Sequence, residues 1–155
     1  PLVLVDQPDL FWPRSVDLGI LSHTLGSSAA TSTNRVFVRR DAAMRQPINE
    51  RQLEEELTNR GFDIVTLSRL SLLEQWKVGG DAGVLVGPHG AGLWISAALA
   101  EGSTLLELSS GEEFERCYQR VALLVGAKYR FLRLTGSARH PFGDYLAAVN
   151  ELASA

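Results

Sequence analysis

The stretch VLVGPHGAGL, residues 84–93, joins a short apolar run to a proline, a histidine and two glycines. Its first three residues are typical of a buried strand, because the run is short, rich in valine and bounded by glycine and proline. Residues 91–99 then suit a helix, so we expect a sharp strand-to-helix turn at the histidine. Turns of this kind, at the carboxyl ends of parallel strands, carry the ligand sites of α/β proteins.

Short apolar strands alternate with amphipathic helices along the rest of the chain. This alternation predicts an α/β fold, a Rossmann-like parallel sheet with helices on both faces. We expect one domain of residues 1–155, in which residues 1–34 form an irregular lead-in. The expected strands cover residues 2–5, 35–39, 62–66, 83–87, 104–108 and 129–134, and the expected helices cover residues 16–25, 49–60, 71–79, 91–99, 110–126 and 141–152.

The composition is that of an ordinary globular domain, with 155 residues, 45% hydrophobic residues and 21% charged residues. The net charge of −3 argues against a dedicated nucleic-acid-binding protein, because such proteins usually present a basic field to the phosphates. No apolar run approaches the roughly 18 residues that a membrane span requires, so we expect no integral membrane segment.

The chain begins with Pro1 instead of methionine, directly in an apolar run, which indicates a fragment of a longer two-domain protein. The single Cys117 cannot form an internal disulfide and fits a reducing compartment. We therefore expect a cytoplasmic protein, free or peripheral to the inner membrane. A surface left exposed by a missing partner half would favour a homodimer.

The histidine-glycine turn is the first candidate for a ligand site. Gly90 and Gly92 let the backbone approach a ligand closely, and the N–H groups of the first helical turn, Ala91 included, favour an anion such as phosphate. The His89 imidazole can donate to an oxygen or transfer a proton near neutral pH. The alternative is that His89 only caps the helix or bonds a loop carbonyl. The pattern matches neither the dinucleotide fingerprint nor the Walker loop, so nucleoside triphosphate hydrolysis is not expected.

Arginines form a second positive feature, with four of them against one acid between residues 35 and 45. We expect Arg39 and Arg40, at the end of a strand, and Arg45, in the next loop, to converge on the crevice that contains His89. The planar guanidinium binds phosphate with two hydrogen bonds and stays charged at any working pH. The alternative is that these arginines are solvated and pair with Asp41 and Glu50. The four arginines are Arg35, Arg39, Arg40 and Arg45.

Glu107 and Ser110 complete the predicted rim, since a carboxylate there can bind ribose hydroxyls as in other nucleotide-binding α/β folds. Trp76 and Trp94 fit core positions best, although Trp94 could flank a base. No histidine has cysteines or acids at the spacing of metal ligands, so we predict no metal site and no cofactor.

Taken together, these segments resemble glycosyltransferase family 61 of the capsular polysaccharide biosynthesis type. Three pieces carry the resemblance, in the order of the family: VFVRRDAAMRQPINERQLEEELTNRGFDIVTLSRLSLLEQ at 36–75, VGPHGAGL at 86–93 and LLELSS at 105–110. The similarity covers about residues 35–130, and the combination of the pieces is more specific than PHGAGL alone.

The resemblance implies a GT-B enzyme whose C-terminal, donor-binding half corresponds to this chain. Such an enzyme transfers a sugar from a nucleotide donor, commonly UDP-linked, to a hydroxyl of a glycan or lipid-linked glycan, with inversion and without an obligatory metal. By family position, Arg39, Arg45, His89 and residues 90–92 carry the donor site. Growing charge on the diphosphate would be stabilised by arginines, helix N–H groups and His89.

The chain departs from the family pattern in several ways. The segment WKVGGDAG at 76–83 has two glycines that weaken a helix end, and Trp94 stands where a smaller or polar residue is usual. No general base can be assigned, and the partner domain that would supply much of the acceptor site is missing. The alternative function is therefore a non-catalytic module that binds a nucleotide-sugar or phosphosugar, and the isolated chain can be inactive without its partner domain.

Overall fold

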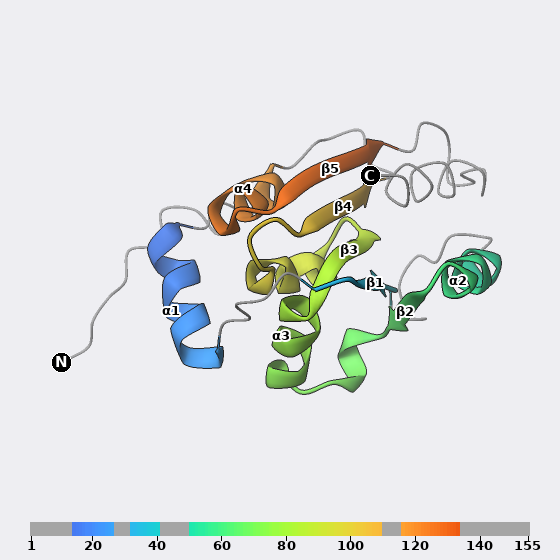
Figure 1. Ribbon diagram of the computed structural model, residues 1–155, viewed down its shortest axis with the longest axis horizontal. Coiled ribbons are helices and arrows are strands. Elements are labelled where there is room, and N and C mark those ends of the chain that lie inside the picture. The colour runs from blue at the N-terminus through green and yellow to red at the C-terminus, as the bar shows by residue number, and fades with distance from the viewer. Residues whose placement is uncertain (1–13, 27–31, 41–49, 110–115, 134–155) are drawn as a thin grey trace.

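The computed structural model describes residues 14–26, 32–40, 50–109 and 116–133. These residues form a five-stranded sheet in which all neighbouring strands are parallel, in the order β2-β1-β3-β4-β5 (Figure 1). The predicted α/β fold is thereby confirmed. The strands are β1 (Asn34–Val38), β2 (Phe62–Val65), β3 (Ala82–Pro88), β4 (Thr104–Ser109) and β5 (Lys128–Arg133).

Helices connect the strands where the sequence predicts them. The predicted helix over residues 91–99 forms as a 3₁₀ helix, because its first hydrogen bond runs from the Leu93 amide to the Gly90 carbonyl three residues earlier. The helices are α1 (Ser15–Leu25), α2 (Glu50–Asn59), η1 (Leu67–Arg69), α3 (Leu72–Gly80), η2 (Ala91–Ala98) and α4 (Cys117–Val125), of which η1 and η2 are 3₁₀ helices.

Successive side chains of each strand point to opposite faces of the sheet, and both faces are buried. One face, with Leu85 of β3 and Leu105 of β4, packs against η2 and α4. The other face, with Phe37 and Val86, packs against Leu57 of α2, which lies beside β2 at one end of the sheet (Figure 1). The helices therefore cover both faces, as predicted, and the carboxyl ends of the strands are left for a site.

Local sequence explains how α3 begins and ends. The predicted capping box forms: the Ser71 hydroxyl accepts from the Glu74 amide, and the Glu74 carboxylate accepts from the Ser71 amide at 2.7 Å. Gly79 has a packing role besides weakening the end of the helix. A Cβ at this position would lie 2.2 Å from the Ile95 carbonyl oxygen and would clash with it. The glycine thus permits the close contact of α3 with η2, which carries the residues after the histidine.

Several predicted segments lie outside the described residues: the strand at 2–5, the helix at 141–152 and the capping box that opens with Ser110. Helix α4 is described only from Cys117 onward. None of the helices in the described ranges is long and apolar enough to cross a membrane.

Candidate functional site

The order of the strands creates a crevice at the carboxyl ends of β1 and β3. Strand β2 lies on one side of β1, and β3 lies on the other, so the chain leaves β1 and β3 in opposite directions along the sheet. At such a switch point the two loops diverge, and ligands of open α/β sheets bind between them.

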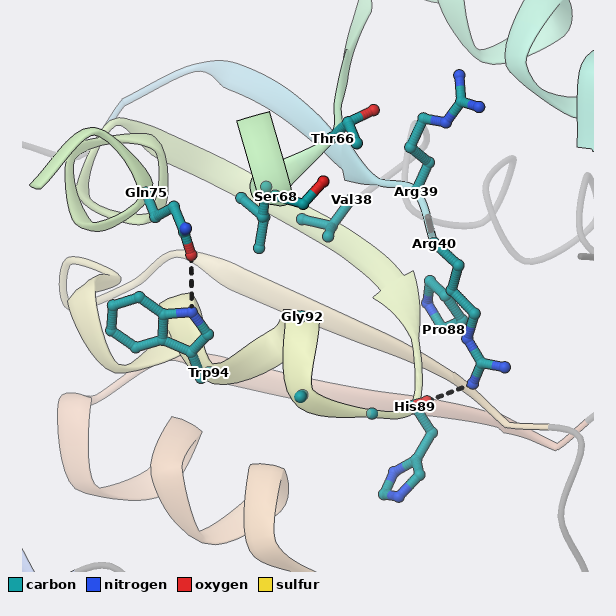
Figure 2. Close-up of a pocket in the computed structure, with 13 residues that line it drawn as sticks. Val38, Arg39, Arg40, Thr66, Ser68, Gln75, Pro88, His89, Gly92 and Trp94 are labelled. Atoms are coloured by element: carbon teal, nitrogen blue, oxygen red, sulfur yellow. Dashed lines mark hydrogen bonds between the residues drawn. The ribbon is translucent and has the colours of Figure 1, made fainter. Parts of the chain in front are cut away.

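A cavity of about 720 Å³ opens at this crevice (Figure 2). The ends of β1 and β3, the segment after β2, and the helices α3 and η2 all contribute to its walls. The lining residues are Val38, Arg39, Arg40, Thr66, Leu67, Ser68, Gln75, Pro88, His89, Gly90, Ala91, Gly92 and Trp94. The structure thus brings together seven of the predicted residues, from Arg39 to Trp94, at one edge of the sheet.

Arg40 connects the end of β1 to the glycine turn. Its Nη2 donates to the backbone carbonyl of His89 at 2.5 Å, across 49 residues of sequence (Figure 2). The guanidinium therefore lies beside the turn at which the sequence predicts an anion, while it also holds the turn in place.

Arg39 instead turns toward helix α2. Its guanidinium pairs with Glu54, with 3.3 Å between Nε and Oε1 and 3.4 Å between Nη1 and Oε2. Both distances are long for a charge-assisted hydrogen bond, and the Nε contact lacks hydrogen-bond geometry. From the sequence, the alternative was that the arginines only pair with nearby acids, Asp41 and Glu50. Arg39 does pair with an acid, but the acid is Glu54. A loose, partly exposed pair can exchange its carboxylate for a phosphate.

Arg35 does not join this group. Arg35 lies at the start of β1, where its guanidinium covers the Phe62 ring at 5.9 Å and donates to the Arg60 carbonyl at 3.4 Å. It belongs to the opposite edge of the sheet. Arg45 and Ser110 lie outside the described residues, so their predicted roles remain predictions.

Glycine is favoured at positions 90 and 92, after β3, for two different physical reasons. Gly90 has φ +143°, a backbone conformation that side chains with a Cβ rarely adopt. At Gly92 a Cβ would lie 3.2 Å from Cγ1 of Val38, so a side chain there would press on β1. The amides of residues 90–92 precede the first hydrogen bond of η2, and this places them at the open end of the helix, where an acceptor can bind them.

His89 lines the cavity, but its imidazole turns toward the buried Glu107 on the other side of the turn. In Figure 2 its imidazole points away from Arg39, Thr66 and Ser68. Its Nδ1 contacts Oε1 of Glu107, a carboxylate with 0% exposure on β4. The Tyr129 hydroxyl donates to Oε2 of the same carboxylate at 2.7 Å.

This cluster changes the interpretation of Glu107. The sequence predicts a rim carboxylate that binds ribose, whereas the structure buries Glu107 and engages both of its oxygens. Burial raises the pKa of Tyr129 far above its usual range, and the hydrogen bond to Glu107 raises it further. The Tyr129 hydroxyl therefore remains a donor, and Glu107 keeps two partners.

Sequence reasoning missed Tyr118 and Tyr129. The Tyr118 hydroxyl, on α4, donates to the Gly90 carbonyl at 2.6 Å, and its ring meets the His89 ring edge-on at 5.8 Å. Tyr129 lies opposite Leu105 in the ladder of β4 and β5, two positions from the pair of Glu107, so both side chains share one face. The alternation of β5 could have shown this, but only once its register with β4 was known.

Trp94 lies between the core and the cavity. Its ring stacks on Trp76 with centroids 5.8 Å apart, and its Nε1 donates to Oε1 of Gln75 at 3.1 Å. Trp76 is buried, with 4% exposure, as expected of a core residue. Trp94 packs against the same core and also lines the cavity, so it is a rigid, partly apolar wall.

Within the described ranges, no group of three His, Cys, Asp or Glu side chains could hold a metal ion. The expected absence of a metal and of a cofactor remains a prediction.

Comparisons with known proteins agree with the resemblance seen in the sequence. A profile of the family described as Glycosyltransferase 61 matches residues 8–106. Beta-1,2-xylosyltransferase of Arabidopsis thaliana is 28% identical over 138 residues, an alignment that covers 74% of this chain. The alignment covers 26% of that protein, so the chain spans about a quarter of the length of this relative.

Proposed function

Because the chain belongs to the glycosyltransferase 61 family, we propose that it is the donor-binding half of a GT-B enzyme. The enzyme transfers a sugar from a UDP-linked donor to an acceptor hydroxyl with inversion. The parallel sheet, with its crevice at the carboxyl ends of β1 and β3, is compatible with this role. The chain aligns with about a quarter of the relative's length, and most of the acceptor site would be formed by parts of the enzyme outside the aligned region.

The cavity is the observation that carries the proposal. Its volume of about 720 Å³ falls in the usual range for sites that bind small molecules, roughly 300–1,000 Å³. Val38 and Trp94 offer apolar surface for a base, while the hydroxyls of Thr66 and Ser68 are placed to bond its ribose (Figure 2). Apolar walls with a few polar groups are what a nucleotide requires.

The diphosphate would lie at the glycine turn. Negative charge develops on the leaving group as the glycosidic bond breaks, so fixed donors near it lower the barrier. Arg40 is already beside the turn, and Arg39 is the second cation if its loose pair with Glu54 opens. The amides of residues 90–92 would add neutral donors. The His89 ring lies on the other side of the turn and is 29% exposed, so it would complete the site where the sugar-diphosphate extends past the turn.

The relative directs the choice of sugar. Its name states a β-1,2-xylosyl transfer, so xylose is the first donor sugar to test on this chain. The acceptor, in this proposal, is a glycan or lipid-linked glycan, and the pathway is the assembly of capsular or other surface polysaccharide. A cytoplasmic location, peripheral to the inner membrane, and a homodimer complete the proposal.

One observation favours a second function, a non-catalytic module that binds a nucleotide-sugar. The His89 ring points away from the cavity, and no described carboxylate of the cavity wall is placed as a general base. A binding module needs the cavity and its cations but no base. Donor binding without sugar release, in a protein that contains both halves, would favour this alternative.

Calorimetric titration with UDP, GDP, CMP and ADP tests the donor site, followed by UDP-xylose. We expect UDP to bind, and Arg39→Ala and His89→Ala each to weaken binding by about 1–3 kcal/mol, the value of a charge-assisted contact. Arg60→Ala is the matched control, since Arg60 pairs with Glu56 at the opposite edge of the sheet. The absence of any binding at millimolar concentration would contradict the proposal.

A further inference from the structure

Glu107 bridges three consecutive strands of the sheet beneath the glycine turn. It extends from β4, contacts His89 at the end of β3 and accepts from Tyr129 of β5 at 2.7 Å. Its side chain has 0% exposure, whereas the His89 side chain is 29% exposed. The buried acid therefore supports a histidine that reaches the surface.

A buried carboxylate is costly unless hydrogen bonds compensate for its lost hydration. Here each oxygen has its own donor, so the cluster is satisfied from within the protein. Burial and the Glu107 carboxylate raise the pKa of Tyr129, which keeps its hydroxyl protonated as a donor. The remaining oxygen must then be served by His89.

The partner of Nδ1 determines the protonation pattern of the imidazole. A carboxylate only accepts hydrogen bonds, so Nδ1 must carry a proton whenever the contact with Glu107 is made. In a neutral ring with a proton on Nδ1, Nε2 is the basic nitrogen. Nε2 is consequently the atom that would donate to a ligand oxygen when the ring is cationic, or accept a proton when it is neutral.

The backbone around His89 is held by separate contacts. The His89 amide donates to the Leu108 carbonyl at 2.6 Å, its carbonyl accepts from Arg40, and the Gly90 carbonyl accepts from Tyr118. These bonds fix the main chain, while the ring contacts Glu107 through Nδ1 and meets the Tyr118 ring edge-on. The acid thus acts on the ring and not on the fold of the turn.

We propose that Glu107 and Tyr129 are positioning residues of the donor site, which hold His89 in the Nδ1–H tautomer and in one orientation. In this arrangement Glu107 acts through His89 and does not bind ribose itself. The consequence for donor binding rests on the proposed function, whereas the tautomer is a property of the protein without ligand.

The tautomer can be measured by long-range ¹H–¹⁵N NMR on protein labelled at histidine nitrogens, at a pH at which the ring is neutral. His89→Gln identifies the signals of His89 among the three histidines. We expect Nδ1 to carry the proton in the wild type. Glu107→Gln should shift the ring toward the Nε2–H form, because the amide group of Gln can also donate to Nδ1.

Tyr129→Phe tests the second member of the cluster and keeps its shape. We expect the Nδ1–H tautomer to persist, with a broadened His89 signal as Glu107 loses one of its two fixed bonds. Glu101→Gln is the matched control, since Glu101 is exposed in the turn before β4, at the other end of that strand, and should leave the signals unchanged. Far-UV circular dichroism verifies that each variant folds.

Donor affinity separates this inference from the proposed function. Glu107→Gln should weaken UDP binding by about 3- to 10-fold, the effect of one hydrogen bond, with Glu101→Gln unchanged. A wild-type protein that fails to bind UDP, but has the Nδ1–H form, overturns the proposed function alone. An Nε2–H form in the wild type, or a tautomer that Glu107→Gln leaves unaltered, overturns the inference.

Discussion

The two sides of the turn after β3 satisfy their polar groups in different ways. On the cavity side, Ser68 is exposed, Thr66 is half-buried, and Arg39 is held by a long pair with Glu54. On the other side, Glu107 is fully buried, and both of its oxygens are bonded within the protein. The cavity side can exchange water or a loose partner for a ligand, whereas the buried side can only hold geometry.

One residue connects the two sides. The backbone of His89 faces the cavity and accepts from Arg40, while its ring enters the buried cluster with Glu107 (Figure 2). A substitution in the cluster around Glu107 should therefore reduce stability more than affinity for UDP. A substitution at the cavity should reduce affinity more than stability.

The largest effect is expected from Glu107→Ala, which leaves the Tyr129 hydroxyl and the His89 imidazole without their acceptor in a buried space. The loss of stability should be about 2–4 kcal/mol, because two partly buried donors lose their acceptor and a void remains in place of the buried Glu107 side chain. Urea denaturation followed by circular dichroism measures it. Arg40→Ala, which removes one partly exposed hydrogen bond, should cost about 1 kcal/mol or less. Equal losses in the two variants would show that the two sides do not differ as described.

The affinity for UDP, in contrast to stability, should depend more on Arg40 than on Glu107. Arg40→Ala removes a cation beside the glycine turn and one anchor of that turn, so UDP binding should weaken about tenfold, near 1.4 kcal/mol. Arg40→Lys should recover part of the loss, because the charge returns without the planar fork. Calorimetric titration at fixed ionic strength measures both, with Arg60→Ala as the control. Full affinity in Arg40→Ala would remove Arg40 from the donor site.

The smallest effect is expected at the start of α3, which belongs to neither side. Ser71→Ala removes a helix cap, so the melting temperature should fall by about 2–4 °C while UDP affinity stays the same. A change in affinity would show that the cavity depends on the whole of α3 and not only on the contact of its Gln75 with Trp94 of η2.

The same cap predicts a dependence on pH. Hydrogen bonds from the Ser71 side chain, and then from its backbone, lower the pKa of Glu74 below its ordinary value of 4.5. The resulting stabilisation is complete above pH 4.5 and is lost as the pH falls through the lowered value. Melting curves between pH 7 and pH 3 should show this decline, and Ser71→Ala should reduce it.

Sequence patterns predicted the local elements well, because each depends on nearby residues. The box of Ser71 and Glu74, the strand before Pro88 and the need for glycine at position 90 are all visible within a few residues. The 3₁₀ form of η2 was not visible in the sequence, and neither was the close approach of Gly92 to Val38 of another strand. For the same local reasons, seven of the residues predicted for the site line one cavity at the carboxyl ends of β1 and β3.

The partners of the site residues could not be predicted in this way. Arg39 pairs with an acid 15 residues later, and Arg40 bonds a carbonyl 49 residues away. The direction of the His89 ring depends on the register of β3, β4 and β5, which brings Glu107 and Tyr129 to one face. Such contacts depend on how elements are placed in space, and no short segment contains that information.

The sequence by itself determined the strands, the helices, the glycine turn and the arginines at the end of β1, because periodicity, capping and backbone freedom are properties of short segments. The tertiary structure decided the strand order that opens a crevice between β1 and β3, and which side of the turn receives the imidazole. The physical reason is that a buried carboxylate is destabilising unless it accepts hydrogen bonds, and only the packed sheet determines which donor side chains are near enough to form them.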